Sequence, residues 1–136
     1  MRKRQISKIL KESFKVTQMF FSECDFKVDN GNDTFHVKVI NVLSTHQVTV
    51  NSQDIWEIKK GRIKGIRFEA ISSDIVNLSE FNKLDNKIIF LANKPFKLLK
   101  VLNESELLDI SGKNEFDNMF VSSDILKIIE FIKEKI

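Results

Sequence analysis

The stretch that decides the fold is Phe26-Lys27-Val28-Asp29-Asn30-Gly31-Asn32-Asp33-Thr34-Phe35-His36-Val37-Lys38-Val39. Large apolar residues alternate with polar ones on both sides of its centre, a period of two that is typical of strands with one buried face. Residues 29–32 have the composition of a tight turn. The stretch therefore predicts a β-hairpin. The apolar run that follows at residues 40–43 predicts that the second strand lies inside a sheet covered on both faces.

The segments around this hairpin predict a helix and further strands. Upstream, apolar residues recur at steps of three and four over residues 4–21, which predicts an amphipathic helix. Downstream, residues 47–50 alternate like a strand. Residues 55–59 suit a strand or a short helix. The strand is favoured because Lys60-Gly61 can form a turn before the alternating residues 63–71, which would make a second hairpin.

The C-terminal half predicts a parallel crossover and a final helix. Residues 87–92 are apolar and β-branched, as in a strand buried on both faces. Pro95 suits the first turn of a helix, so a helix is predicted over residues 96–102, followed by a strand at residues 107–110. These elements together predict a parallel strand–helix–strand unit. A Ser-Ser-Asp start predicts a last helix from about residue 123 to residue 135.

These segments predict a mixed α/β (α+β) fold in a single domain over residues 1–136. A central mixed sheet would combine antiparallel hairpins with the parallel strand–helix–strand unit, flanked by the N- and C-terminal helices. The chain has one cysteine, which cannot form an internal disulfide or hold zinc alone, so a cytoplasmic location is expected. No stretch approaches the roughly 20 apolar residues of a membrane span, so no membrane partner is expected.

Charge is unevenly distributed along the chain, although the net charge is only +3. Basic residues cluster near the N-terminus and in one short segment, which contains Lys59, Lys60, Arg62, Lys64 and Arg67. A glycine-bent basic hairpin can bring cations close to phosphates, so this segment predicts DNA or RNA binding. Acidic residues gather at residues 104–117, and a protein partner that meets the charged faces is the alternative. A solvated mixed surface also fits clusters of this size.

Asp25, His36 and Lys38 point most directly to chemistry. A helix, an Asp-bearing strand and a strand with two functional residues flanking an apolar one are together similar to the PD-(D/E)XK nuclease family. The resemblance implies a mixed sheet flanked by helices, with Asp25 as a magnesium ligand and Lys38 positioning or activating the attacking water. His36 stands in place of the second acid, and imidazole is a poor ligand for magnesium. Glu57, which forms a second Glu-x-Lys pattern with Lys59, could substitute for that acid.

The leading hypothesis is a nucleic-acid-associated module with an incomplete nuclease-like site, without efficient catalysis and without a cofactor. A protein-interaction or assembly module is the alternative. A metal-dependent endonuclease that uses Asp25, Lys38 and Glu57 comes third, and only that function would require magnesium. For these residues the competing interpretation is a polar sheet face or an exposed strand edge.

Overall fold

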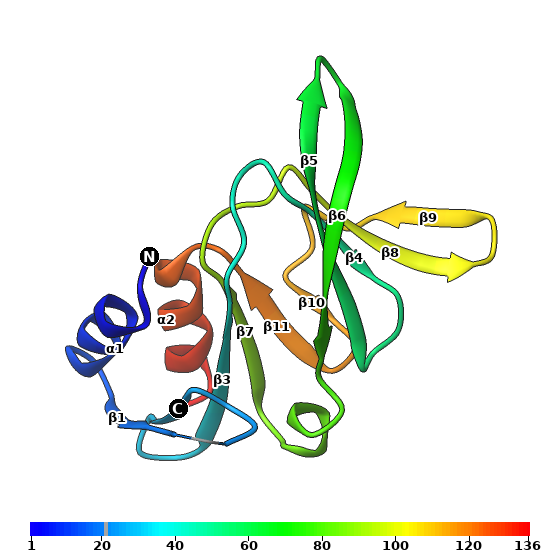
Figure 1. Cartoon of the computed structure of the whole chain (residues 1–136). Coiled ribbons are helices and arrows are strands. Elements are labelled where there is room, and N and C mark those ends of the chain that lie inside the picture. Colours follow the sequence, from blue (N-terminus) through cyan, green and yellow to red (C-terminus); the bar gives the residue numbers. More distant parts are fainter. Residues whose placement is uncertain (21) are drawn as a thin grey trace.

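The structure, a computed structural model, describes residues 1–20 and 22–136, and these residues form three layers (Figure 1). Two helices make the first layer, a six-stranded sheet (sheet A) the second, and a five-stranded sheet (sheet B) the third. The elements in chain order are α1 (Lys3–Lys11), β1 (Lys15–Gln18), β2 (Phe26–Asp29), β3 (Thr34–Ile40), β4 (Gln47–Val50), β5 (Ile55–Lys64), β6 (Arg67–Asn77), the 3-10 turn η1 (Phe81–Lys83), β7 (Lys87–Leu91), β8 (Lys97–Asn103), β9 (Glu106–Asp109), β10 (Glu115–Phe116), β11 (Met119–Ser122) and α2 (Ile125–Glu134). The mixed α/β fold class is thus confirmed.

Sheet A contains the predicted hairpin. Its strand order is β1-β2-β3-β7-β11-β10, with β1, β2 and β3 antiparallel and β3, β7 and β11 parallel. In the hairpin Phe26 pairs with Val37 and Val28 with Phe35. All four of these side chains are buried against the helices, which is the face that the alternation predicted. The position of β3 inside the sheet, between β2 and β7, is also confirmed.

Sheet A is buried on both faces. One face packs against α1 and α2 through a cluster that includes Leu10, Phe26 and Ile128. The other face packs against sheet B, whose inner side chains include Trp56 and Ile58. Sheet B has the order β6-β5-β4-β8-β9, with β4 and β8 parallel and the other pairs antiparallel. A sheet therefore covers the face on which an α/β protein usually carries more helices.

The predicted N-terminal helix over residues 4–21 is wrong for residues 12–20, and Phe21 lies outside the described residues. The chain continues as β1, in which Val16 pairs with Val28 of β2. Phe14 and Val16 still pack against the helix-side core, so their burial does not require a helix. The β-branched Val16 and Thr17 favour the extended backbone, and the available edge of β2 satisfies its hydrogen bonds.

The predicted helix over residues 96–102 and the strand–helix–strand unit are also wrong. This segment is strand β8, which pairs with β4 in sheet B, whereas β7 belongs to sheet A. Leu98 lies beside Val48 and is buried in the core between the sheets, so tertiary pairing overrides local helix preference. The predicted strand at residues 107–110 exists as β9 and pairs antiparallel with β8. The parallel crossovers of sheet A are made by strands of sheet B.

The final helix is confirmed as α2, and Asp124 is its N-cap. The Asp124 side chain accepts a hydrogen bond of 2.9 Å from the Leu126 N–H, as its sequence position predicted. Neither helix in the described part of the chain is long and apolar enough to cross a membrane.

The second predicted hairpin is confirmed, but its turn is displaced. The turn lies at Gly65 and Ile66 instead of Lys60-Gly61, and Gly65 has a φ of 64°, which favours glycine. Gly61 lies within β5, next to an irregularity where Ile71 of β6 has no partner. The hairpin extends well beyond the rest of the molecule (Figure 1). We call its outer part, residues 60–72, the arm.

Gly61 allows the two strands of the arm to approach closely, because a Cβ atom at this position would lie 1.9 Å from the Glu69 carbonyl oxygen. We expect Gly61→Ala to loosen the arm. Amides between Gly61 and Ala70 should exchange with solvent about tenfold faster or more, as measured by hydrogen exchange. No atom lies within 4 Å of the corresponding position at Gly112, so Gly112→Ala is the matched control. Unchanged protection in Gly61→Ala would contradict this account of the arm.

Candidate functional site

Asp25 lies immediately before β2 and has two donors at its carboxylate. The Lys3 ammonium is 2.8 Å from Oδ1, and the Val39 backbone N–H donates to Oδ2 over 2.7 Å. The Asp25 carbonyl accepts a hydrogen bond from the Met19 N–H. The Asp25 carboxylate therefore accepts the hydrogen bond of the Val39 N–H in β3, at the end of β2 where no backbone carbonyl of β2 is available. Partners of this kind, an ammonium and a backbone N–H, are typical of a carboxylate with a structural role. They are not the environment of a metal ligand.

His36 and Lys38, although two residues apart on β3, have different surroundings. The His36 Nδ1 atom is 2.6 Å from the Asp85 carbonyl oxygen and 3.7 Å from the Asp85 carboxylate. Because a carbonyl can only accept, Nδ1 carries a proton. Lys38 instead lines a cavity near the other end of β3. The two side chains therefore share the face of β3 that points away from the helices, but they make different contacts.

Glu57 lies in sheet B, on the face that points away from sheet A. Its carboxylate accepts a hydrogen bond of 2.9 Å from the Ser73 hydroxyl and lies 3.9 Å from the Lys59 ammonium. Asp25 lies immediately before β2 of sheet A, so these two acids occupy different layers. Within residues 1–20 and 22–136 no group of three or more His, Cys, Asp or Glu side chains could hold a metal ion.

The cavity beside Lys38, which we call the cleft, lies between β3 and the base of the β5–β6 hairpin and has a volume of about 650 Å³. Its charged and titratable side chains are Arg2, Lys38, His46, Lys60 and Asp74. They come from the start of α1, from β3, from the loop after β3 and from both strands of the hairpin. His46 and Asp74 are not recognisable as site residues in the sequence, because no spacing links them to the other residues of the cleft.

One face of the arm is charged and exposed. Trp56 and Ile58 of β5 are buried in the core, and alternation places Lys60, Arg62 and Lys64 on the same face beyond the core. Arg67 pairs with Lys64 across the turn and lies on this face too. The four basic residues therefore form a strip that begins at the cleft and ends at the tip.

Two carboxylates neutralise part of this strip. Asp74 forms an ion pair with Lys60, and Glu69 lies 2.8 Å from Lys64. Among the described residues, Arg62 and Arg67 have no carboxylate within 4 Å. Because these ion pairs are exposed, each contributes little to stability. The strip consequently keeps an excess of positive charge available to a ligand.

The opposite face of the arm is apolar. Ile63 pairs with Phe68, and the Phe68 ring stacks on Phe96 with centroids 6.2 Å apart. This contact holds the apolar face toward the loop before β8 and leaves the basic strip in solvent. Of the five basic residues predicted to bind nucleic acid, Lys59 lies on the other face of β5, beside Glu57. The other four share the strip.

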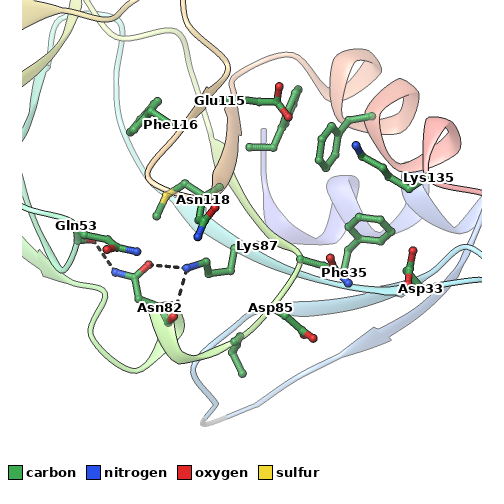
Figure 2. Close-up of a pocket in the computed structure, with 15 residues that line it drawn as sticks. Asp33, Phe35, Gln53, Asn82, Asp85, Lys87, Glu115, Phe116, Asn118 and Lys135 are labelled. Carbon is green, nitrogen blue, oxygen red and sulfur yellow. Dashed lines mark hydrogen bonds between the residues drawn. The ribbon is translucent and has the colours of Figure 1, made fainter.

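A second cavity, of about 780 Å³, lies at the start of β7 (Figure 2). The side chain of Lys87 is directed toward Asn82, with Nζ 3.2 Å from the Asn82 carbonyl oxygen, and Asn82 donates to the Gln53 carbonyl. The buried Lys87 side chain therefore connects η1 to β7 of sheet A through this hydrogen bond. The carboxylates that line this cavity are Asp33, Asp85 and Glu115. They make it less suitable for an anion than the cleft.

Comparison of the chain with protein-family models, curated proteins and solved structures gives no match.

The Asp25 contacts predict different effects for two substitutions. We expect Asp25→Ala to lower the free energy of unfolding by about 1 to 3 kcal/mol, because the Val39 N–H loses its acceptor. Asp25→Asn keeps an acceptor oxygen and loses the half-exposed ion pair with Lys3, so its cost should be below about 1 kcal/mol. Urea unfolding measures both values. Equal stability of Asp25→Ala and the wild-type protein would contradict the structural role of this carboxylate.

Proposed function

We propose that the protein binds nucleic acid through the sugar–phosphate backbone, with the basic strip of the arm as the main contact surface. The observation that carries the proposal is the continuity of Lys60, Arg62, Lys64 and Arg67 on one exposed face of a projecting hairpin. Lys and Arg side chains that neutralise phosphates release condensed counterions, which gives affinity without sequence preference. The net charge of the whole chain is only +3, because acidic residues elsewhere offset the local positive charge of the strip.

The shape of the arm supports the same proposal. A two-stranded ribbon is narrow enough to enter the major groove of a duplex or to lie along a single strand. Ile66 at the tip is 89% exposed, and an apolar side chain at the end of a basic hairpin suits contact with a sugar or a base. The charged face carries no Asn or Gln side chain that would read base edges, so binding should be largely independent of sequence.

We propose further that the protein has no efficient nuclease activity, although its sequence around Asp25 and Lys38 resembles the PD-(D/E)XK motif. Mixed sheet A with its two helices supports the resemblance. Three observations argue against cleavage: both Asp25 carboxylate oxygens already have partners, His36 replaces an acid, and Glu57 lies in sheet B. Magnesium would be required only for cleavage. Magnesium-dependent cleavage that is lost in both Asp25→Asn and Lys38→Ala would overturn this part of the proposal.

Cys24 supports a cytoplasmic location for this function. It is the one cysteine of the chain and is buried in the core between the sheets, so it forms no disulfide. Burial raises the pKa of its thiol, which keeps the side chain protonated and unreactive. A reducing compartment is consistent with both properties.

Replacing the two arginines that lack a carboxylate partner tests the proposal. We expect Arg62→Gln/Arg67→Gln to weaken binding to a single-stranded oligonucleotide and to reduce the slope of log K against log salt by about 1.4. Fluorescence anisotropy over a range of salt concentrations measures both effects. The matched control is Lys127→Gln/Lys133→Gln, which removes two exposed lysines from α2. If both double variants reduce the slope equally, the arm is not the binding surface.

Assembly of the protein with further copies of itself is a second candidate function, because the two edges of sheet B differ in charge. The β8–β9 hairpin exposes Leu102, Leu107 and Leu108 and carries Glu104 and Glu106. The basic arm is at the opposite edge of the sheet. An acidic hairpin of one copy is therefore complementary to the arm of another, a head-to-tail arrangement that forms rings or chains.

Charge exchange tests this second candidate. We expect wild-type protein to form oligomers at low salt, and Glu104→Lys/Glu106→Lys and Arg62→Glu/Arg67→Glu to remain monomeric when each is studied alone. Mixing these two variants should restore association, because each supplies the charge that the other lacks. Multi-angle light scattering measures the mass. A monomeric wild-type protein at every salt and protein concentration would exclude assembly.

A further inference from the structure

The cleft has a cationic rim and an apolar floor. Arg2 and Lys38 line it, and among the described residues neither side chain has a carboxylate within 4 Å. The floor is formed by core residues, including Ile40, Val42 and Ile58. A continuous polymer cannot pass through a cavity that ends on a packed core. A chain end or a small molecule can enter it, and the volume of about 650 Å³ lies within the range of small-molecule sites.

The third cation of the cleft, Lys60, has an acidic partner. Its ammonium forms an ion pair with Asp74, and both side chains are largely exposed. Because an exposed ion pair is weak, an entering anion can compete with Asp74 for Lys60. Asp74 thus holds Lys60 in place and also repels the ligand. Asp74 should therefore weaken the binding of an anionic ligand, whereas the cations around it strengthen that binding.

His46 presents a hydrogen-bond donor to the cleft. The Leu43 backbone N–H donates to His46 Nδ1 over 3.0 Å, so Nδ1 is an acceptor and carries no proton. Burial lowers the pKa of His46, and the Lys60 charge lowers it further, while Asp74 opposes the shift. The ring is therefore neutral at pH 7, and its proton is on Nε2. No described protein group accepts a hydrogen bond from Nε2, which leaves this donor for a ligand.

We propose that the cleft binds the phosphate monoester of a nucleotide, either at the end of a nucleic acid chain or in a free mononucleotide. Arg2, Lys38 and Lys60 contact the phosphate oxygens, the His46 Nε2–H donates to one of them, and the apolar floor receives the sugar or the base. Several charged donors suit the terminal oxygens of a phosphate group. The chain-end source of the ligand rests on the nucleic-acid binding proposed above, whereas mononucleotide binding does not.

NMR of the histidine rings tests the site directly, because the chain has only His36 and His46. The probes are inorganic phosphate, adenosine monophosphate and adenosine. We expect phosphate and the monophosphate to shift the His46 ring signals, and adenosine at the same concentration to leave them unchanged. His36 is the internal control, because its ring is bonded to Asp85 outside the cleft. Absence of a His46 response, or equal responses of both rings, would overturn the proposal.

Four variants assign the contacts in the cleft. Lys38→Gln should weaken monophosphate binding about tenfold, and Asp74→Asn should strengthen it about threefold. His46→Gln keeps a donor near the Nε2 position and should retain binding. His46→Asn keeps the acceptor for Leu43 and loses that donor, so it should bind more weakly. Weaker binding by Asp74→Asn would contradict the repulsive role of this carboxylate and the proposed ligand charge.

Oligonucleotides of one sequence, with and without a terminal phosphate, distinguish the two proposals. We expect the phosphorylated oligonucleotide to bind about tenfold more tightly, and Lys38→Gln to remove this difference. In Arg62→Gln/Arg67→Gln both oligonucleotides should bind more weakly while their ratio is kept. A ratio of one in the wild-type protein overturns chain-end binding and leaves the arm proposal standing. A His46 response to monophosphate without any oligonucleotide binding overturns the arm proposal and chain-end binding, and leaves mononucleotide binding standing.

Discussion

The structure depends on the burial of strand β7 on both faces. All five of its residues are buried, and it lies between its parallel neighbours β3 and β11. Ile88 and Phe90 face the helices, whereas Ile89 and Leu91 face sheet B. Each such side chain gains about 1.5 to 3 kcal/mol from full burial, so both faces must be covered. The two helices cover one face of β7, and sheet B covers the other.

The candidate site follows from the excess length of sheet B. Strand β5 needs only its first half for the core, and Ile58 is its last buried residue. The same face then continues into solvent, where charged side chains are preferred. The strand periodicity that places Trp56 and Ile58 in the core therefore also aligns Lys60, Arg62 and Lys64. The cleft lies between β3 of sheet A and β5 of sheet B. Strand β5 therefore contributes both to the core and to the candidate binding surface.

Local patterns predicted the parts of this molecule that local sequence determines. The period of two in β2 and β3, the apolar run of β7 and the Asp124 cap all specify their elements without distant partners. The four basic residues of the strip were predictable because they belong to one hairpin. The strands at Val16 and Leu98 were not predictable because their partners, Val28 and Val48, lie 12 and 50 residues away and outside any local pattern. The cleft could not be predicted, since its charged residues come from separate elements.

Asp25, His36 and Lys38 lie near one another in the sequence pattern, but the fold gives each of them different contacts. The β2–β3 register, continued by one residue, places Asp25 opposite Lys38, as a nuclease-like site would require. The Asp25 carboxylate nevertheless bonds to the Val39 N–H, because the pairing of β2 ends there and a buried strand needs an acceptor. His36 is held at the other end of β3 by Asp85. Lys38 alone keeps its charge uncompensated, and it faces a cavity with other cations. In that position its chemistry favours binding an anion over activating a water molecule.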